Sequence, residues 1–296
     1  YYRAFYKPFG VWHWWERMIR KAAGLGVANL SASPQYQDKQ YLFCDVAVVG
    51  AGPAGLSAAL KAAEGGASVL LIDEQPELGG SLTYHRFAID SSAVRGEAET
   101  LIANVASHRR IKVLTHALCN GWFTDHYLPV IHGDRLFKVR AKSCVLATGS
   151  SEQHVVFRNN DLPGVVLCSA LERLINHYAV GPQGELVVLA GNDQAWMTAL
   201  TAAEAGLSVA TVVDLRDAPD DAALLTEANE RGMTVHMGAT VYTARRSAGS
   251  QSLSGVDIHR IDAQGEVGEL IAQHDCAVLA MSAGFMPAYQ LACQAG

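Results

Sequence analysis

The sequence lacks the patterns that define a dithiol enzyme or a membrane protein. Its six cysteines, scattered from Cys44 to Cys293, never form C-x-x-C. This excludes a dithiol reductase and is typical of reduced thiols in a cytoplasmic protein. No run approaches the roughly 18 apolar residues of a membrane-spanning helix, because the longest candidate, residues 276–286, contains Ser282 and Gly284. We therefore expect a soluble cytoplasmic protein that does not contact a membrane.

Charge and metal-binding patterns are also sparse. Lys and Arg number 23 against 29 Asp and Glu, for a net charge of −6, so a clustered basic surface for nucleic acid is not expected. The eleven His residues show no H-x-x-x-H and no mixed Cys/His spacing for a metal. No G-x-S-x-G elbow and no candidate general base stand out. We predict no complete active site within the chain.

The N-terminal region is aromatic and differs from the rest of the chain. Eight aromatic residues lie within residues 1–15. We predict an arm, a short helix over residues 12–23 and a linker over 27–41, so that residues 1–43 form one region. So dense an aromatic arm needs a partner surface, either its own domain or another polypeptide. The chain starts without Met and ends with no element clearly closed, and we expect it to be a piece of something longer.

The length of 296 residues suggests about two domains. Half of all residues are apolar, which suffices for a sizeable core, and two stretches of the chain alternate strand and helix. We predict an α/β, flavoprotein-like fold with two Rossmann-type dinucleotide-binding domains, the second inserted in the first. The first domain covers 44–165 and 275–296, and the inserted domain covers 166–274. Expected elements are strands at 45–49, 68–72, 112–114, 141–147, 186–190, 208–213 and 275–280, helices at 53–64, 93–106, 194–205 and 221–231, and a meander at 116–140.

The strongest motif is a G-x-G-x-x-G turn after a strand and before a helix, Gly50-Ala51-Gly52-Pro53-Ala54-Gly55. The first Gly permits the tight turn, the second leaves room for a pyrophosphate, and the third lets the helix pack closely on the strand. Asp73 ends the next strand and is placed to bind ribose hydroxyls. A carboxylate there, rather than Arg, favours NAD or FAD over NADP. We predict a dinucleotide site at this turn.

The second domain carries a broken version of the turn, Gly191-Asn192-Asp193-Gln194-Ala195-Trp196. Asp193 stands where the second Gly belongs, and its carboxylate would oppose a pyrophosphate. Trp196 replaces the third Gly. Asp214 still closes the following strand. We predict that the second domain is a scaffold that binds no nucleotide. The chain would then differ from a reductase that transfers electrons from NAD(P)H to FAD, because such a reductase needs two dinucleotide sites.

Several segments together resemble the alpha subunits of heterotetrameric sarcosine oxidases. The specific parts are Tyr1-Tyr-Arg-Ala-Phe-Tyr6 with Trp14–Gly26, and Asn160-Asp-Leu-Pro-Gly-Val165. Other matching parts are Ile72-Asp-Glu-Gln75, Leu78-Gly-Gly-Ser-Leu82, Ala147-Thr-Gly149, and Ser282-Ala-Gly284 with Pro287. The chain departs from the family at Glu152-Gln153-His154, where an acidic-basic pair before Pro is usual, and at Ala117-Leu118, where hydroxyl residues are usual.

The resemblance implies NAD in this dinucleotide fold, with FMN at the boundary to a beta subunit and FAD within it. It implies as partners a flavin-bearing beta subunit and the small subunits. The beta-subunit FAD would oxidise an N-methyl amine, with sarcosine the first guess; related oxidases act on opines and hydroxyproline. From motif and resemblance together, we predict as cofactor-binding residues Gly50, Gly52, Pro53, Ala54, Gly55, Asp73, Glu74, Gln75, Gly80, Ser81, Ala117, Ala147, Thr148, Gly149 and Gly284.

Two other functions stay open. The chain could instead be an independent FAD-dependent oxidoreductase, which would be yellow. Alternatively, it could be a non-catalytic nucleotide-binding module that uses the aromatic arm to dock a partner. Co-purification with a flavin-bearing subunit distinguishes the oxidase hypothesis from the module.

Overall fold

The computed structural model describes residues 10–24, 26, 29–31, 38–90, 92–247, 249 and 251–295. The chain divides into two compact units, Tyr1–Gln37 and Asp38–Gly296. In the first unit, helix α1 (Trp12–Ala22) confirms the predicted helix, and none of its residues is buried. Residues 1–9 of the predicted aromatic arm lie outside the described residues. No helix in the described part of the chain combines the length and apolarity needed to cross a membrane.

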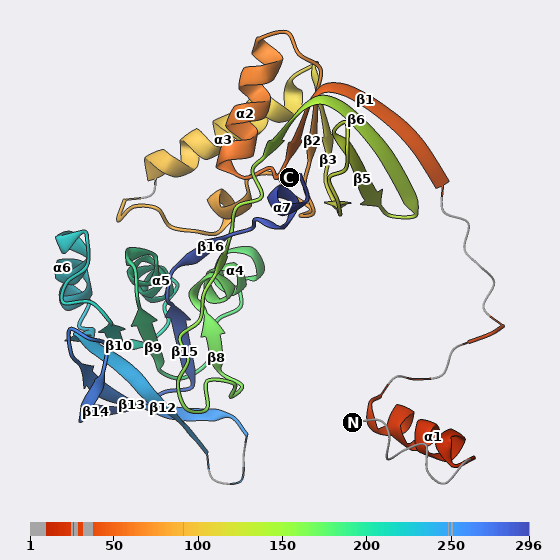
Figure 1. The fold of residues 1–296 in the computed structure, drawn as a ribbon. Coiled ribbons are helices and arrows are strands. Elements are labelled where there is room, and N and C mark those ends of the chain that lie inside the picture. The colour runs from red at the N-terminus through yellow and green to blue at the C-terminus, as the bar shows by residue number, and fades with distance from the viewer. Residues whose placement is uncertain are drawn as a thin grey trace. The chain divides into compact units, whose positions relative to one another are not determined.

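The second unit begins with a six-stranded sheet, which we call the first subdomain together with its helices (Figure 1). The strand order is β3-β2-β1-β6-β5-β4. Strands β1, β2, β3 and β6 are parallel, whereas β4 and β5 pair antiparallel in the meander. The elements are β1 (Asp38–Val49), α2 (Pro53–Glu64), β2 (Val69–Ile72), α3 (Ser92–Ser107), β3 (Ile111–Leu114), β4 (Ala117–Cys119), β5 (Tyr127–His132) and β6 (Arg135–Leu146).

Two strands of this sheet are longer than predicted. We placed a linker over residues 27–41, but β1 already begins at Asp38. Its first half pairs with β6, from Asp38 opposite Arg135 onward. Strand β6 in turn joins the end of the meander and the predicted return strand into one element. The polar residues at the start of β1 concealed this extension, because they lie half-exposed or exposed on a ribbon with no buried face to impose an apolar pattern.

The second subdomain is a five-stranded sheet of order β11-β10-β9-β15-β8 with a three-stranded antiparallel sheet beside it. Apolar side chains from α5, β9 and β10 form one of its cores. The elements are β8 (Val165–Leu167), α4 (Cys168–Tyr178), β9 (Leu186–Ala190), α5 (Asp193–Glu204), β10 (Val209–Asp214), α6 (Ala222–Glu230), β11 (Thr234–Met237), β12 (Ala239–Arg246), β13 (Leu253–Ile261), β14 (Val267–Asp275) and β15 (Val278–Ser282). The two-subdomain α/β class predicted from the sequence is confirmed, although helix α4 was not predicted.

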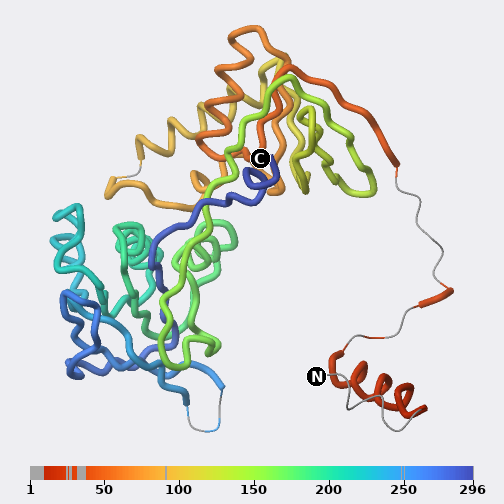
Figure 2. The backbone as a smooth tube through the Cα atoms, viewed as in Figure 1, coloured from red at the N-terminus to blue at the C-terminus, as the bar shows by residue number. Residues whose placement is uncertain are grey.

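Two segments connect the subdomains and run side by side (Figure 2). They are the antiparallel pair β7 (Ser150–Glu152) and β16 (Phe285–Pro287). After β16, helix α7 (Gln290–Ala295) returns to the first subdomain, where Leu291 packs in its core. We assigned residues 275–296 to the first domain, but β15 pairs with β9 and β8 in the second sheet. The return therefore begins about ten residues later than predicted, after β15.

Candidate dinucleotide site

The glycine-rich turn between β1 and α2 leaves no room for side chains at two of its glycines. Gly50 has φ +101°, and a Cβ there would lie 2.1 Å from the carbonyl oxygen of Ala147. A Cβ on Gly55 would lie 1.8 Å from the carbonyl oxygen of Gly50. The turn is also fixed by backbone hydrogen bonds from Gly50 N–H to Ile72 O and from Ala147 N–H to Val49 O, both 2.8 Å. Gly50 and Gly55 therefore serve the close packing of strand, turn and helix.

Gly52 differs from these two because the space beside it is open. No atom lies within 4 Å of the position that its Cβ would take, and its φ of −72° suits any residue. Gly52 is the N-cap of α2, and no side chain caps the helix. The N–H groups of Ala54 and Gly55 have no acceptor within the helix. An open position in front of unsatisfied helix N–H groups fits a pyrophosphate.

Asp73 follows β2, beside the turn. One carboxylate oxygen accepts a hydrogen bond from Ala51 N–H and the other from Gln75 N–H, at 2.7 Å in the second case. The side chain is half-buried, whereas Glu74 and Gln75 are exposed. Each oxygen keeps a further lone pair for a ribose hydroxyl. Asp73 thus shapes the turn, a role that the sequence does not reveal, and its contact with a ribose stays a prediction.

The glycine pair that follows Asp73 lies against the turn. Gly79 N–H donates to Ala51 O at 2.9 Å. Next, Gly80 begins the short 3-10 helix η2 (Gly80–Thr83), and a Cβ on Gly80 would lie 2.9 Å from Gly52 Cα. Ser81 is half-buried within η2. These contacts place the glycine pair against the glycine-rich turn, and binding of a cofactor by Gly80 and Ser81 stays a prediction.

The remaining predicted residues are placed unevenly around the turn. Ala147 touches Gly50 and Gly55 directly. Ala117 N–H donates to Asp73 O, and the residue is only 1% exposed, so it presents almost no surface to a ligand. The Thr148 hydroxyl donates to Ala288 O at 2.8 Å, and Gly149 O accepts from Ala288 N–H. Gly284, with φ +126°, accepts a hydrogen bond from Gln153 N–H beside β7, so its contact lies with the connecting strands.

Sequence reasoning missed Ala51 and Ala288 as site residues. Ala51 is fully buried, and both its N–H and its carbonyl are used, by Asp73 and Gly79 respectively. Ala288 satisfies both Thr148 and Gly149. Both act through the backbone, so no side-chain type marks them. Only the position of Ala51 inside the G-x-G-x-x-G motif was a usable signal.

The corresponding turn of the second subdomain is occupied by the chain's own side chains. Asn192 caps α5 by accepting from Ala195 N–H at 3.1 Å. Asp193 accepts from Arg216 at 2.8 Å and from the N–H groups of Asp220 and Asp221. Burial alone would raise the pKa of Asp193, but these hydrogen bonds lower it overall. A carboxylate that stays ionised at the first turn of α5 would repel an anionic ligand there.

The Asp214 carboxylate at the end of β10 is also hydrogen-bonded within the second subdomain. Trp196 packs in the core with 1% exposure, and its indole N–H donates to Asp214 at 2.6 Å. Arg216 binds both oxygens of Asp214, and the hydrogen bond with Asp214 is the main cause that raises the pKa of the guanidinium. Asp214 has no exposed surface. Its carboxylate is therefore not accessible to a ribose hydroxyl.

The cysteines of the described part of the chain form no disulfide. All six cysteines are free thiols. Burial raises the pKa of Cys44 to about 11 and that of Cys276 to about 12, so these thiols stay protonated at neutral pH. No group of three or more His, Cys, Asp or Glu that could hold a metal occurs among these residues.

The geometry defines a protein of the class built from two dinucleotide-type folds. Its solved structural neighbours include thioredoxin reductase of T. acidophilum, at TM-score 0.66 and 19% identity over 84% of this chain and 79% of that one. L-proline dehydrogenase from P. horikoshii is similar at TM-score 0.59 and 23% identity over 90% of this chain and 47% of that one. At these identities the likeness concerns the fold alone.

Sequence comparison defines the family. Residues 44–296 match the pyridine nucleotide-disulphide oxidoreductase family, and the chain belongs to it. Sarcosine oxidase subunit alpha of Rhizobium meliloti (strain 1021) is 32% identical over the whole of this chain, and that of Corynebacterium sp. (strain P-1) is 34% identical over 90% of it. The predicted resemblance to these alpha subunits is confirmed. The chain spans only 30% and 29% of the length of these two relatives.

Proposed function

We propose that the first subdomain binds one dinucleotide, NAD, and that the chain is the NAD-binding region of the alpha subunit of a sarcosine oxidase-like amine oxidase. The observation that carries the proposal is the open position at Gly52, in front of the uncapped helix α2. Elsewhere in the turn, space is so tight that two glycines could not carry a Cβ. The turn therefore has open space at Gly52, where a pyrophosphate would lie, and none at Gly50 and Gly55.

The side chains near the ribose position favour NAD over NADP. Asp73, Glu74 and Gln75 follow β2, and no Arg stands among them to bind a 2′-phosphate. The Asp73 carboxylate, a hydrogen-bond acceptor beside the turn, would repel a phosphate at that position. The preference for NAD over FAD comes from the likeness to sarcosine oxidase alpha subunits.

Identifying the nucleotide tests the proposal directly. The purified protein is denatured, and the released nucleotide is analysed by absorption spectrum and mass. The mass of NAD without visible flavin absorption supports the proposal. Release of FAD would favour the alternative of an independent FAD-dependent oxidoreductase, and a protein that neither carries nor binds a nucleotide would contradict both.

The remainder of the catalytic machinery would lie in partner subunits. We propose a flavin-bearing beta subunit and small subunits as partners, with FMN and FAD held there and an N-methyl or other secondary amine as substrate. Co-expression with the candidate beta subunit and affinity purification through this chain tests the assembly. A chain that purifies alone under these conditions, while still binding NAD, would favour the non-catalytic nucleotide-binding module.

Replacing Asp73 tests the ribose contact. Asp73→Ala removes a carboxylate that we expect to bind ribose hydroxyls, and should weaken NAD by about 1 to 3 kcal/mol, the usual scale for charge-assisted hydrogen bonds. Because Asp73 also holds Ala51 N–H, Asp73→Asn serves as the matched control, retaining an acceptor oxygen and the side-chain volume. Titration calorimetry should rank the affinities wild type, Asn, Ala; equal affinity in all three would remove Asp73 from the site.

We expect one nucleotide per chain. In the second subdomain, Asn192 and Asp193 already fill the start of α5, and Asp214 is sealed by Trp196 and Arg216. Asp193→Gly should not create a second site, because Trp196 still occupies the core beside Asp214. Calorimetry of the wild type and of Asp193→Gly measures this. Binding of two nucleotides per wild-type chain would contradict this prediction and would favour a reductase with two dinucleotide sites.

A further inference from the structure

Residues 83–89 continue from the end of η2 and contact the second subdomain; we call them the strap. At its start, the Thr83 hydroxyl donates to Gly80 O at 2.8 Å, and His85 N–H donates to Ser81 O at 2.8 Å. Gly79 and Gly80, just before it, contact Ala51 and Gly52. The strap is therefore continuous with the backbone that packs against the glycine-rich turn.

The middle of the strap contacts a buried polar cluster of the second subdomain. His85 Nδ1 contacts a carboxylate oxygen of Glu172 on α4, and the Glu172 side chain has no exposed surface. Gln194 on α5 donates to Glu172 at 3.2 Å and lies 3.2 Å from His85 Nδ1. Burial raises the pKa of Glu172, although its contact with His85 opposes this. A buried carboxylate with two partners is costly to separate from them.

Residues on either side of His85 bind the same two helices. Asn176 on α4 donates to Tyr84 O at 2.7 Å, and Arg173 donates to the Tyr84 hydroxyl at 2.9 Å while lying 4.4 Å from the ring centroid. The largely buried Arg86 pairs with Glu204 at the end of α5. Ile89 packs against the apolar core of the second subdomain. In sequence the strap lies between elements of the first subdomain, but its side chains pack on the second subdomain.

We propose that the second subdomain, although its own nucleotide turn is filled, serves as the anchor that holds the strap and thereby positions Gly79 and Gly80 over the cofactor turn. The proposal rests on the proposed nucleotide site. The proposal assigns a function to the altered turn over residues 191–196, because Gln194 of this turn donates a hydrogen bond to Glu172, the carboxylate that His85 of the strap contacts. His85, Glu172 and Gln194 are in this view positioning residues.

The anchor can be weakened without touching the nucleotide site. Arg173→Ala combined with Asn176→Ala removes two exposed side chains of α4 that bind Tyr84, and should leave the fold intact. His85→Leu removes the buried contact as a second variant. Arg231→Ala is the matched control, because Arg231 also binds Glu204 but from within the second subdomain. Two measurements are made: amide hydrogen exchange at residues 79–81 in the nucleotide-free protein, and NAD affinity.

We expect both anchor variants to exchange at residues 79–81 at least tenfold faster than the wild type and to bind NAD at least fivefold more weakly, with Arg231→Ala unchanged. The Gly79 N–H is a direct reporter, because it donates to Ala51 O. Unchanged exchange at residues 79–81 in the double variant would overturn the anchor. If the wild type bound no nucleotide, the proposed function would fail, while the exchange measurement would still decide whether the strap is anchored.

Discussion

Gly52→Val is expected to lower NAD affinity at least a hundredfold while leaving the free energy of unfolding within about 1 kcal/mol of the wild type. The backbone at Gly52 has φ −72°, which Val adopts freely, and no protein atom lies within 4 Å of the new Cβ. The Cβ of the branched side chain therefore meets no clash, and the side chain fills the position proposed for the pyrophosphate. Calorimetric titration with NAD and urea unfolding measure the two quantities.

Two further glycines make this result interpretable. Gly96→Val on the exposed face of α3 is the matched control, since its Cβ also meets nothing within 4 Å. It should leave NAD affinity unchanged, and because Val has a higher helix propensity than Gly it should not destabilise α3. Gly55→Val is the opposite case, because its Cβ would overlap the Gly50 carbonyl, and it should destabilise the protein. Normal NAD affinity in Gly52→Val would remove the nucleotide from this turn.

The first subdomain was predictable because its turn leaves a local record in the sequence. Gly50 and Gly55 are required by clashes with backbone atoms only a few residues away or on the neighbouring strand, and Asp73 follows at the expected spacing. The filled second turn was likewise readable from Asp193 and Trp196. The ion pair with Arg216 and the indole bond to Asp214 supply the physical reason.

Long-range pairing was not predictable in the same way. The apolar run that forms β15 reads as a buried strand, but its local pattern does not tell which of two parallel sheets receives it. Helix α4 begins without a capping side chain, so its start carries no signal. His85 and Glu172 stand 87 positions apart in sequence. The anchor of the strap therefore becomes visible only when α4 and the strap are seen together.

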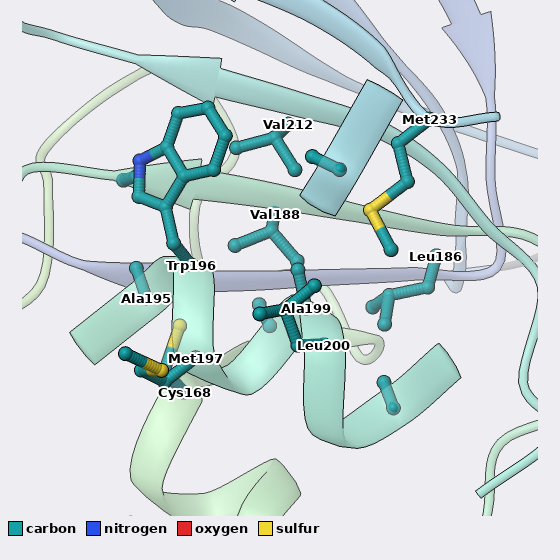
Figure 3. Packing of buried hydrophobic residues seen from close by; sticks show 14 of the residues in the cluster. Cys168, Leu186, Val188, Ala195, Trp196, Met197, Ala199, Leu200, Val212 and Met233 are labelled. Atoms are coloured by element: carbon teal, nitrogen blue, oxygen red, sulfur yellow. The ribbon is translucent and has the colours of Figure 1, made fainter. Parts of the chain in front are cut away.

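Trp196→Ala should have the largest effect on stability, lowering the free energy of unfolding by about 3 to 5 kcal/mol, the range for removing a large buried aromatic side chain. The indole is 1% exposed and packs near Val188 and Val212 (Figure 3). Its loss opens a cavity and leaves the buried Asp214 with Arg216 as its remaining side-chain partner. Urea unfolding measures the effect.

Trp196→Phe separates the two contributions, because it keeps most of the apolar volume and removes the N–H donor to Asp214. We expect it to cost about 1.5 to 3 kcal/mol, as for a hydrogen bond to a charged group. Neither variant should bind a second nucleotide, since Asn192 and Asp193 still fill the start of α5. A cost below about 1 kcal/mol for Trp196→Ala would mean that the indole does not support this core, and a second NAD equivalent in that variant would mean that Trp196 alone closes the second site.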